Sequence, residues 1–191
     1  MTNAKFENVL ATFCSPVLLR QKVSNLVSVS KRDIPEISIL VDAYNGKFET
    51  HGIKMERICE CDKRILLLVY SESQLIKHLK DGEVSKILTF YGYKKSSNIE
   101  EYIETLRNRM AMEDFPHEIG VFLGYPLSDV KGFIANNGKN YNYCGYWKVY
   151  GDTAEAKKIF SIYDRLRDFV VAELNGGREL DNIVAQFKNI A

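Results

Sequence analysis

The chain has 191 residues, of which 46% are hydrophobic and 27% are charged, and its 26 Lys and Arg residues almost balance its 25 Asp and Glu residues. This length is enough for one domain whose core buries well over half of the unfolded surface. A near-neutral charge removes the usual electrostatic basis for binding nucleic acid or an anionic membrane, so we expect neither as a partner.

No segment has the composition of a membrane span or an export signal. The longest apolar run, Ile65–Tyr70, is far shorter than the roughly 20 residues that a membrane-spanning helix needs. The first residues lack an apolar segment followed by a cleavage site. We therefore expect a cytoplasmic protein that folds as a single domain over residues 1–191, with a helical C-terminal extension at about 152–188.

The cysteines Cys14, Cys59, Cys61 and Cys144 are expected to remain thiols, because a protein without an export signal folds in a reducing compartment. Cys59 and Cys61 form a C-x-C pair, whereas zinc knuckles need C-x-x-C pairs and a second pair at ligand spacing. The sequence therefore predicts neither a bound metal nor another cofactor.

The N-terminal third has the periodicity of helices. A short helix is expected around Lys5–Ala11, and Ser15 followed by Pro16 is typical of an N-cap and the first position of the next helix. Cys14 would then lie immediately before a helix N-terminus. A polar break is expected at Ser28–Asp33, before further helical periodicity.

Residues 53–70 have the pattern of an antiparallel hairpin. Apolar and polar residues alternate over about Ile53–Cys61, as in a strand with one solvated face. The partner, Arg64–Tyr70, is continuously apolar and is expected to be central in the sheet. The connection Asp62-Lys63 is too short for the crossover that parallel strands need, so the pair should be antiparallel.

The remaining elements are mostly helical. Asn98 is a predicted N-cap for an amphipathic helix, and Asp152 opens a long C-terminal helix. Between them, alternating apolar residues predict strands at about 117–123 and 141–150, separated by a short helix from Leu127. The expected fold is therefore α+β, with a small, mostly antiparallel four-stranded sheet wrapped by helices.

The segment Phe115–Asp152 concentrates one His, one Cys, six Gly, five Tyr and the only Trp of the chain. Its glycines permit tight turns, and its aromatic rings could form the wall of a pocket on which a planar ligand stacks. Lys139 or Lys148 would meet a negative group on that ligand. The alternative is that the same rings are simply the core and its rim. The predicted ligand-binding residues are Glu118, Lys139, Asn140, Tyr146 and Trp147.

The sequence words PHEIGVFLGYP, DVKGFI, GKNY and CGYWKVYGD, together with the early Cys14-Ser15-Pro16, resemble the signature of a bacterial family known as domain of unknown function 3793. The resemblance covers nearly the whole chain, and CGYWKVYGD is long enough to be specific. It implies no activity, so it assigns a role to none of these residues.

Cys14 and His117 form a second candidate site. A thiol at a helix N-terminus has a lowered pKa, and a histidine that begins a strand could act as its base. This order of a helix-borne Cys and a strand-borne His resembles papain-like thiol hydrolases, although the sequence words of those enzymes are absent. Asn140, Asp152 and Glu118 all remain open as the third member. A free cysteine is also often a small buried hydrophobe, which is the alternative for Cys14.

Hypotheses from different classes follow from these observations. The leading one is a binding or accessory protein with a ligand or partner pocket near residues 115–152, which takes a small molecule or a protein. The rival is a thiol-dependent hydrolase or transferase with Cys14 as nucleophile and His117 as base. A protein that packs its C-terminal helices onto a partner, or onto a second copy as a homo-oligomer, is the third alternative.

Overall fold

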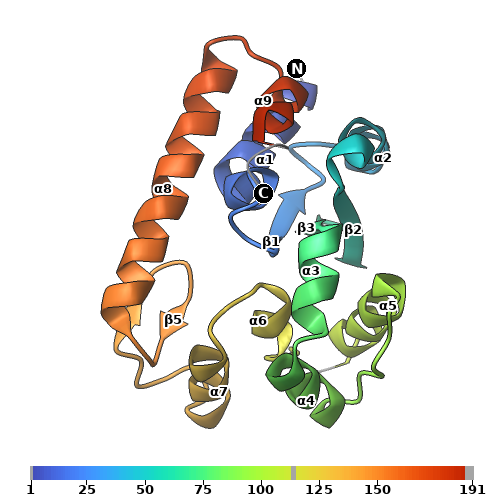
Figure 1. The fold of residues 1–191 in the computed structure, drawn as a ribbon. Coiled ribbons are helices and arrows are strands. Elements are labelled where there is room, and N and C mark those ends of the chain that lie inside the picture. The colour runs from blue at the N-terminus through green and yellow to red at the C-terminus, as the bar shows by residue number, and fades with distance from the viewer. Residues whose placement is uncertain (1, 113–114, 188–191) are drawn as a thin grey trace. The chain divides into compact units, whose positions relative to one another are not determined.

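The structure is a computed structural model that describes residues 2–112 and 115–187 and has an α+β fold (Figure 1). Its internal contacts divide the chain into two compact units, which we describe one at a time. Unit 1 is Met1–Leu75 with Arg165–Ala191, and unit 2 is Ile76–Asp164. Both boundaries fall inside helices, namely α3 (Glu72–Leu79) and α8 (Thr153–Asn175).

The sheet of unit 1 consists of β1 (Ser24–Ser30), β2 (Ile53–Glu60) and β3 (Arg64–Ser71). The strand order is β1-β3-β2, and both pairings are antiparallel. The hairpin expected at residues 53–70 and the central position of its apolar strand are therefore confirmed. The register shifts between Arg57 and Cys59 of β2.

Strand β1 was not expected, because its serines were interpreted as part of a polar break from Ser28 onward. Val27 and Val29 are buried while Ser28 between them is exposed, so the strand does have the alternation of a sheet with one covered face. The small serines do not prevent pairing, and Val27 and Val29 face Leu67 and Ile65 across the ladder.

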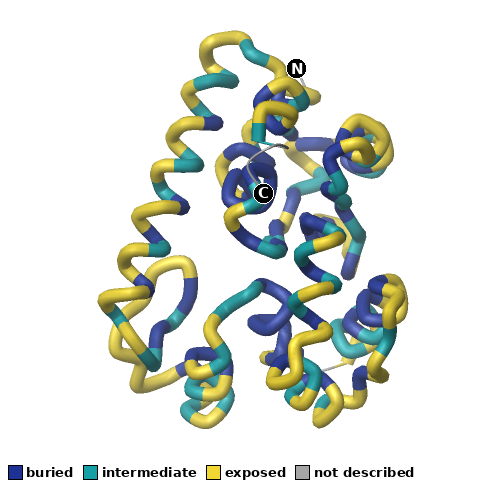
Figure 2. Tube along the Cα trace, in the orientation of Figure 1, coloured by how far each residue is buried: buried dark blue, intermediate teal, exposed yellow. Residues whose placement is uncertain are grey.

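The helices of unit 1 bury apolar faces together with the sheet in one core, which Figure 2 shows as dark blue segments on the sheet and α1. Phe6, Leu10 and Tyr44 are among its fully buried side chains. The rings of Phe6 and Tyr44 meet edge to face at 5.3 Å. The elements are α1 (Thr2–Leu18), α2 (Ile37–Phe48), the 3-10 turn η1 (Glu49–His51) and α9 (Leu180–Gln186).

The expectation that a new helix starts at Ser15-Pro16 is wrong, because α1 runs through both residues without interruption. Proline lacks an N–H and normally weakens a helix interior. Here the buried stripe that includes Leu10, Cys14 and Val17 continues across Pro16 and stabilises one long helix. Cys14 consequently lies inside a helix and not at an N-terminus.

Unit 2 is mainly helical, and two of its helix starts agree with the sequence. The Asn98 side chain accepts a hydrogen bond from the Glu100 amide at 2.9 Å, and the Asp152 side chain caps α8 by accepting from the Ala154 and Glu155 amides at 2.8 and 3.0 Å. The elements are α4 (Gly82–Phe90), α5 (Ile99–Met110), α6 (Ile119–Phe122), α7 (Leu127–Ala135), β4 (Tyr143–Cys144) and β5 (Lys148–Val149).

The strand expected at 117–123 is wrong, because this segment contains the helical turn α6. Four consecutive residues, Ile119 to Phe122, are all buried, so the apolar alternation did not mark one face of a strand. The His78 ring nitrogen lies 2.9 Å from the carbonyl oxygen of Val121 and ties this turn to the end of α3.

The strand expected at 141–150 is also wrong in length. Gly145 turns the chain in the middle of it, with its amide donating to the Trp147 carbonyl at 3.1 Å, so β4 and β5 pair with each other as a small hairpin. In the described part of the chain the strands therefore form a three-stranded and a two-stranded sheet instead of one sheet of four. Among the same residues, no helix is long and apolar enough to cross a membrane.

Matched Gly→Ala substitutions test the packing of α7. A Cβ on Gly132 would lie 2.4 Å from Cγ and 2.5 Å from Cβ of Tyr150, atoms too close to the backbone to move aside. Gly132→Ala should therefore lower the free energy of unfolding by about 1–3 kcal/mol. Gly46→Ala, in α2, meets nothing within 4 Å and should raise it by about 0.5–1 kcal/mol. Urea denaturation followed by circular dichroism measures both, and equal shifts would contradict the described packing.

Candidate functional site

Unit 2 contains a cavity of about 380 Å³ between α6, α7 and the β4–β5 hairpin. We call it the aromatic cavity, because six of its lining residues carry aromatic rings. Phe115, His117, Cys144 and Tyr146 are exposed, so the cavity opens to solvent. Its lining residues are Phe115, His117, Ile119, Gly120, Tyr125, Asp129, Val130, Phe133, Cys144, Gly145, Tyr146, Trp147 and Lys148.

The carboxylate of Asp129 fixes the position of the hairpin against α7. Asp129 is in the first turn of α7 and only 4% exposed. The Trp147 indole N–H donates to Oδ2 at 2.7 Å, and the amides of Tyr150 and Gly151 both donate to Oδ1 at 2.8 Å. These three bonds compensate a buried carboxylate that would otherwise be costly. They also set the orientation of the indole ring.

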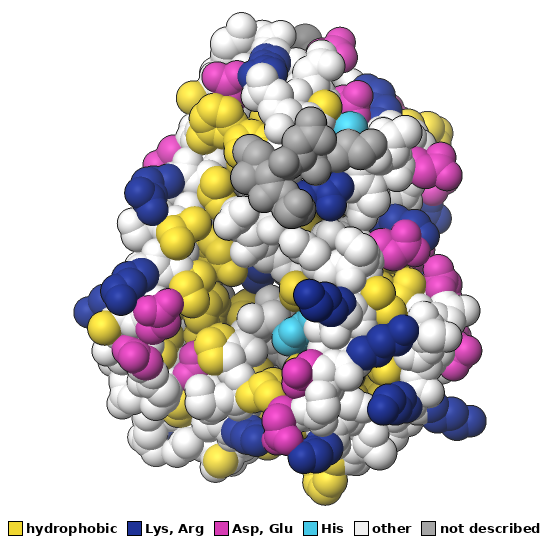
Figure 3. All heavy atoms as spheres, viewed as in Figure 1, with side chains coloured by type: hydrophobic (Ala, Val, Ile, Leu, Met, Phe, Trp, Pro, Cys, Tyr) yellow, Lys and Arg dark blue, Asp and Glu magenta, His cyan; other side chains and the backbone are white. Residues whose placement is uncertain are grey.

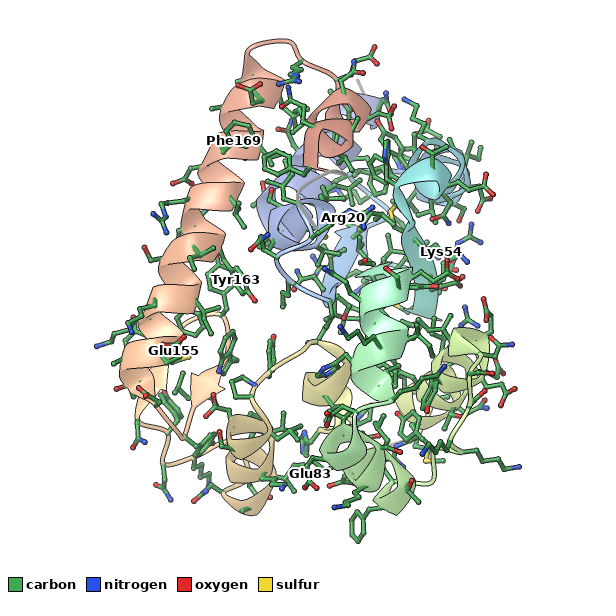
Figure 4. The ribbon with its side chains drawn as sticks, viewed as in Figure 1. Arg20, Lys54, Glu83, Glu155, Tyr163 and Phe169 are labelled. Atoms are coloured by element: carbon green, nitrogen blue, oxygen red, sulfur yellow. The ribbon has the colours of Figure 1, made fainter. Side chains whose placement is uncertain are left out.

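Trp147 is one of the aromatic residues of the cavity lining and contacts two further rings. Its ring stacks on Tyr125 at 4.9 Å and meets Phe160 of α8 edge to face at 4.5 Å. Tyr146 contacts the ring of Tyr163, which Figure 4 labels on α8, at 5.3 Å. Contacts of this kind add to the stabilisation from buried area and restrict ring rotation. The wall is therefore formed before any ligand enters.

The tyrosine hydroxyls of this wall are hydrogen-bonded or buried. The Tyr146 hydroxyl donates to Oδ1 of Asp164 at 3.0 Å, and burial raises the pKa of Tyr125 and of Tyr163 to about 12. Tyr125 and Tyr163 therefore stay protonated at neutral pH and are uncharged.

Two lining residues have nitrogen-bearing side chains. They are His117, just before α6, and Lys148, the first residue of β5. The His117 ring meets the ring of Phe133 at 5.2 Å. The Lys148 ammonium lies 5.7 Å from the centroid of the same ring and 5.0 Å from that of Tyr141. Phe133 thus has an imidazole and an ammonium as neighbours. His117 and Lys148 thus add nitrogen-bearing side chains to a mostly apolar lining.

Glu118 does not line the cavity. It is fully buried, and the guanidinium of Arg109 donates to both of its oxygens, with Nη2 to Oε2 at 3.2 Å. The Tyr93 hydroxyl also donates to Oε1 at 3.2 Å. Burial and the adjacent Glu118 raise the pKa of Tyr93. The Glu118 carboxylate therefore holds α6 to α5, and its predicted ligand role has no support from this geometry.

Lys139 and Asn140 are also outside the cavity lining. Both are exposed, and Asn140 has a positive φ of 57° in the turn after α7. The carbonyl of Lys139 accepts a hydrogen bond from the Tyr150 hydroxyl at 2.9 Å. Of the predicted ligand-binding residues, Tyr146 and Trp147 thus line the aromatic cavity, and His117 is in the same lining.

Cys14 and His117 belong to different units, Cys14 to unit 1 and His117 to unit 2. The thiol of Cys14 is fully buried in the core of unit 1, and this burial raises its pKa to about 12. The expected helix N-terminus, which would have lowered the pKa, is not present at this position. Cys14 therefore has the environment of a small buried hydrophobe, the alternative that the sequence left open.

Several cavity residues were not predicted as site residues from the sequence. Asp129 had a signal, an acidic residue in the first turn of a predicted helix, but such residues are usually exposed and interact with the helix dipole. Tyr125 and Phe133 were interpreted as turn and helix residues. Cys144 was assigned only as a thiol, and no local pattern indicates that a hairpin would place it opposite Lys148.

Comparison with protein families gives a match over most of the chain. The family described as "Protein of unknown function (DUF3793)" matches residues 10–184. Searches of curated proteins and of solved structures found no match.

Alkylation rates test the thiol-enzyme hypothesis. At pH 8, iodoacetamide should modify Cys14 slower than Cys61 and Cys144 by on the order of a hundredfold or more, because Cys14 is buried and the other two are exposed. His117→Ala should leave the Cys14 rate unchanged. Peptide mass spectrometry gives each rate. Fast modification of Cys14 that slows in the His117→Ala variant would instead support a Cys14–His117 nucleophile.

Proposed function

The chain belongs to DUF3793, a family of proteins of unknown function, and we propose that it is a binding protein. It would hold a small, largely apolar molecule in the aromatic cavity. The observation that carries the proposal is the fixed Trp147 wall beside an open, apolar hollow. The volume of about 380 Å³ lies in the lower part of the range typical of small-molecule sites.

The chemistry of the lining supports binding more than catalysis. The described contacts include no hydrogen bond between the Cys144 thiol and the His117 imidazole, although both line the cavity. Asp129, the acidic residue of the lining, already accepts three hydrogen bonds from the protein. A nucleophile–base pair needs a direct hydrogen bond, or a looser approach that substrate tightens. A stacking surface for a ligand needs only the rings that are already fixed.

A small molecule is a better occupant than a protein segment because the lining is concave and comes from a single stretch of the chain, residues 115–148. We also propose that the protein is bacterial and cytoplasmic. Cys14, Cys59, Cys61 and Cys144 are free thiols, which fits a reducing compartment.

The face in Figure 3 has basic and acidic side chains interspersed, which agrees with the proposal that nucleic acid is not a partner.

The neutral dye N-phenyl-1-naphthylamine provides a probe for the cavity. Trp147 is the only tryptophan of the chain, so its emission reports on this wall alone. The dye should quench this emission with a saturable 1:1 dependence. Cys144→Phe adds a ring to the cavity from an exposed position. Because this ring occupies space that the dye needs, the substitution should weaken dye binding by about tenfold or more.

Cys61→Phe is the matched control, because Cys61 is an exposed thiol of unit 1 that receives the same side chain. Its dye affinity should equal that of the wild-type protein. Linear quenching without saturation, or an equal loss in both variants, would contradict a binding site in the aromatic cavity.

A further inference from the structure

On the basis of the proposed binding function, we infer that the ligand of the aromatic cavity is an apolar acid, a molecule with an aromatic body and one anionic group that the Lys148 ammonium binds. The inference concerns the charge of the ligand and the residue that binds the charged group. It rests on the contacts of Lys148, on the state of Asp129 and on the position of His117.

Lys148 has an unused capacity for an anion. Its Nζ donates to the Gly138 carbonyl at 2.7 Å, whereas an ammonium has three N–H donors. Within the described residues no carboxylate forms an ion pair with it, in contrast to Lys31, Lys54 and Lys86, whose ammonium groups lie 2.6 Å from a glutamate oxygen. The side chain is half-buried, so its charge is less screened than one at the open surface.

The position of the ammonium is fixed by its surroundings. It donates to the carbonyl of Gly138, and the centroids of the Tyr141 and Phe133 rings lie 5.0 and 5.7 Å from it. Gly138 has a φ of +70°, and a Cβ there would lie 3.0 Å from the Phe133 ring and 3.5 Å from Nζ of Lys148. The turn therefore approaches closely enough to hold the cation. A held cation loses little side-chain entropy when an anion binds.

The acidic residue of the lining does not compete with a bound anion for this cation. Both oxygens of Asp129 accept hydrogen bonds from the hairpin, and the residue is only 4% exposed. His117 adds donor capacity to the same region, because its ring contacts Phe133, the ring that also lies next to Lys148. An acid whose body stacks on the aromatic wall can thus place its charged group at the Lys148 end.

A matched pair of dyes tests the charge of the ligand. 8-Anilino-1-naphthalenesulfonate is N-phenyl-1-naphthylamine with one added sulfonate, so the ratio of their affinities isolates the anionic group. Lys148→Met should weaken binding of the sulfonate dye by about tenfold more than it changes binding of the neutral dye, the effect of one charge-assisted hydrogen bond. Lys139→Met, an exposed lysine outside the lining, should affect neither.

The arms separate the failure of this inference from the failure of the binding function. If the neutral dye binds but Lys148→Met does not discriminate between the dyes, the cavity is a binding site and the anion assignment is wrong. If neither dye binds the wild-type protein, the binding function itself is wrong.

A measurement on the wild-type protein covers the case in which Lys148→Met disturbs the turn at Gly138. Raising NaCl should weaken the sulfonate dye and not the neutral dye, because salt screens only the charged contact. Equal salt dependence of both dyes would overturn the assignment. Lys148→Arg, which keeps the charge, should retain the preference for the sulfonate dye.

Discussion

The buried carboxylate of Asp129 is the constraint on which the aromatic cavity depends. A carboxyl group at 4% exposure is tolerated only when hydrogen-bond partners occupy its oxygens. The hairpin supplies three, from the Trp147 indole and from the amides of Tyr150 and Gly151. Because these donors come from the hairpin and the acceptor comes from α7, the bonds define the distance and angle between the opposing sides of the cavity.

The remaining features of unit 2 build on that connection. Close approaches at Gly132 and Gly145, where an added Cβ would overlap Tyr150 and Phe160, let the hairpin lie directly on α7 and α8. Glu118, which is fully buried, and Arg109, which is partly exposed, fix α6 by an ion pair. A wall that is ordered without ligand reduces the ordering that binding would otherwise require. Lys148 is then the charged group of the lining that keeps donors for a ligand, which links the packing of unit 2 to the proposed recognition of an apolar acid.

Much of the architecture was accessible from the sequence, because helices and hairpins with one solvated face leave a periodic pattern. The hairpin at 53–70, the cap at Asn98 and the α+β class follow from such patterns and are confirmed. The errors arise where tertiary contacts override local signals: the long α1 through Pro16, the fully buried turn α6, and the short hairpin that Gly145 makes. The aromatic residues Tyr146 and Trp147 were identified by their density. Asp129 was not, because its burial depends on a hairpin more than a dozen residues away.

The central claim is that Asp129 holds the Trp147 wall in place, and the emission of the single tryptophan tests it most directly. Asp129→Asn keeps the shape but puts an NH₂ donor where one oxygen accepted, so the indole N–H or the backbone amides lose a partner. We predict a red-shifted emission, greater quenching by acrylamide and loss of N-phenyl-1-naphthylamine binding. Asp164→Asn, which still offers an oxygen to the Tyr146 hydroxyl, should retain the wild-type emission. Wild-type emission and dye binding in the Asp129→Asn variant would contradict the account.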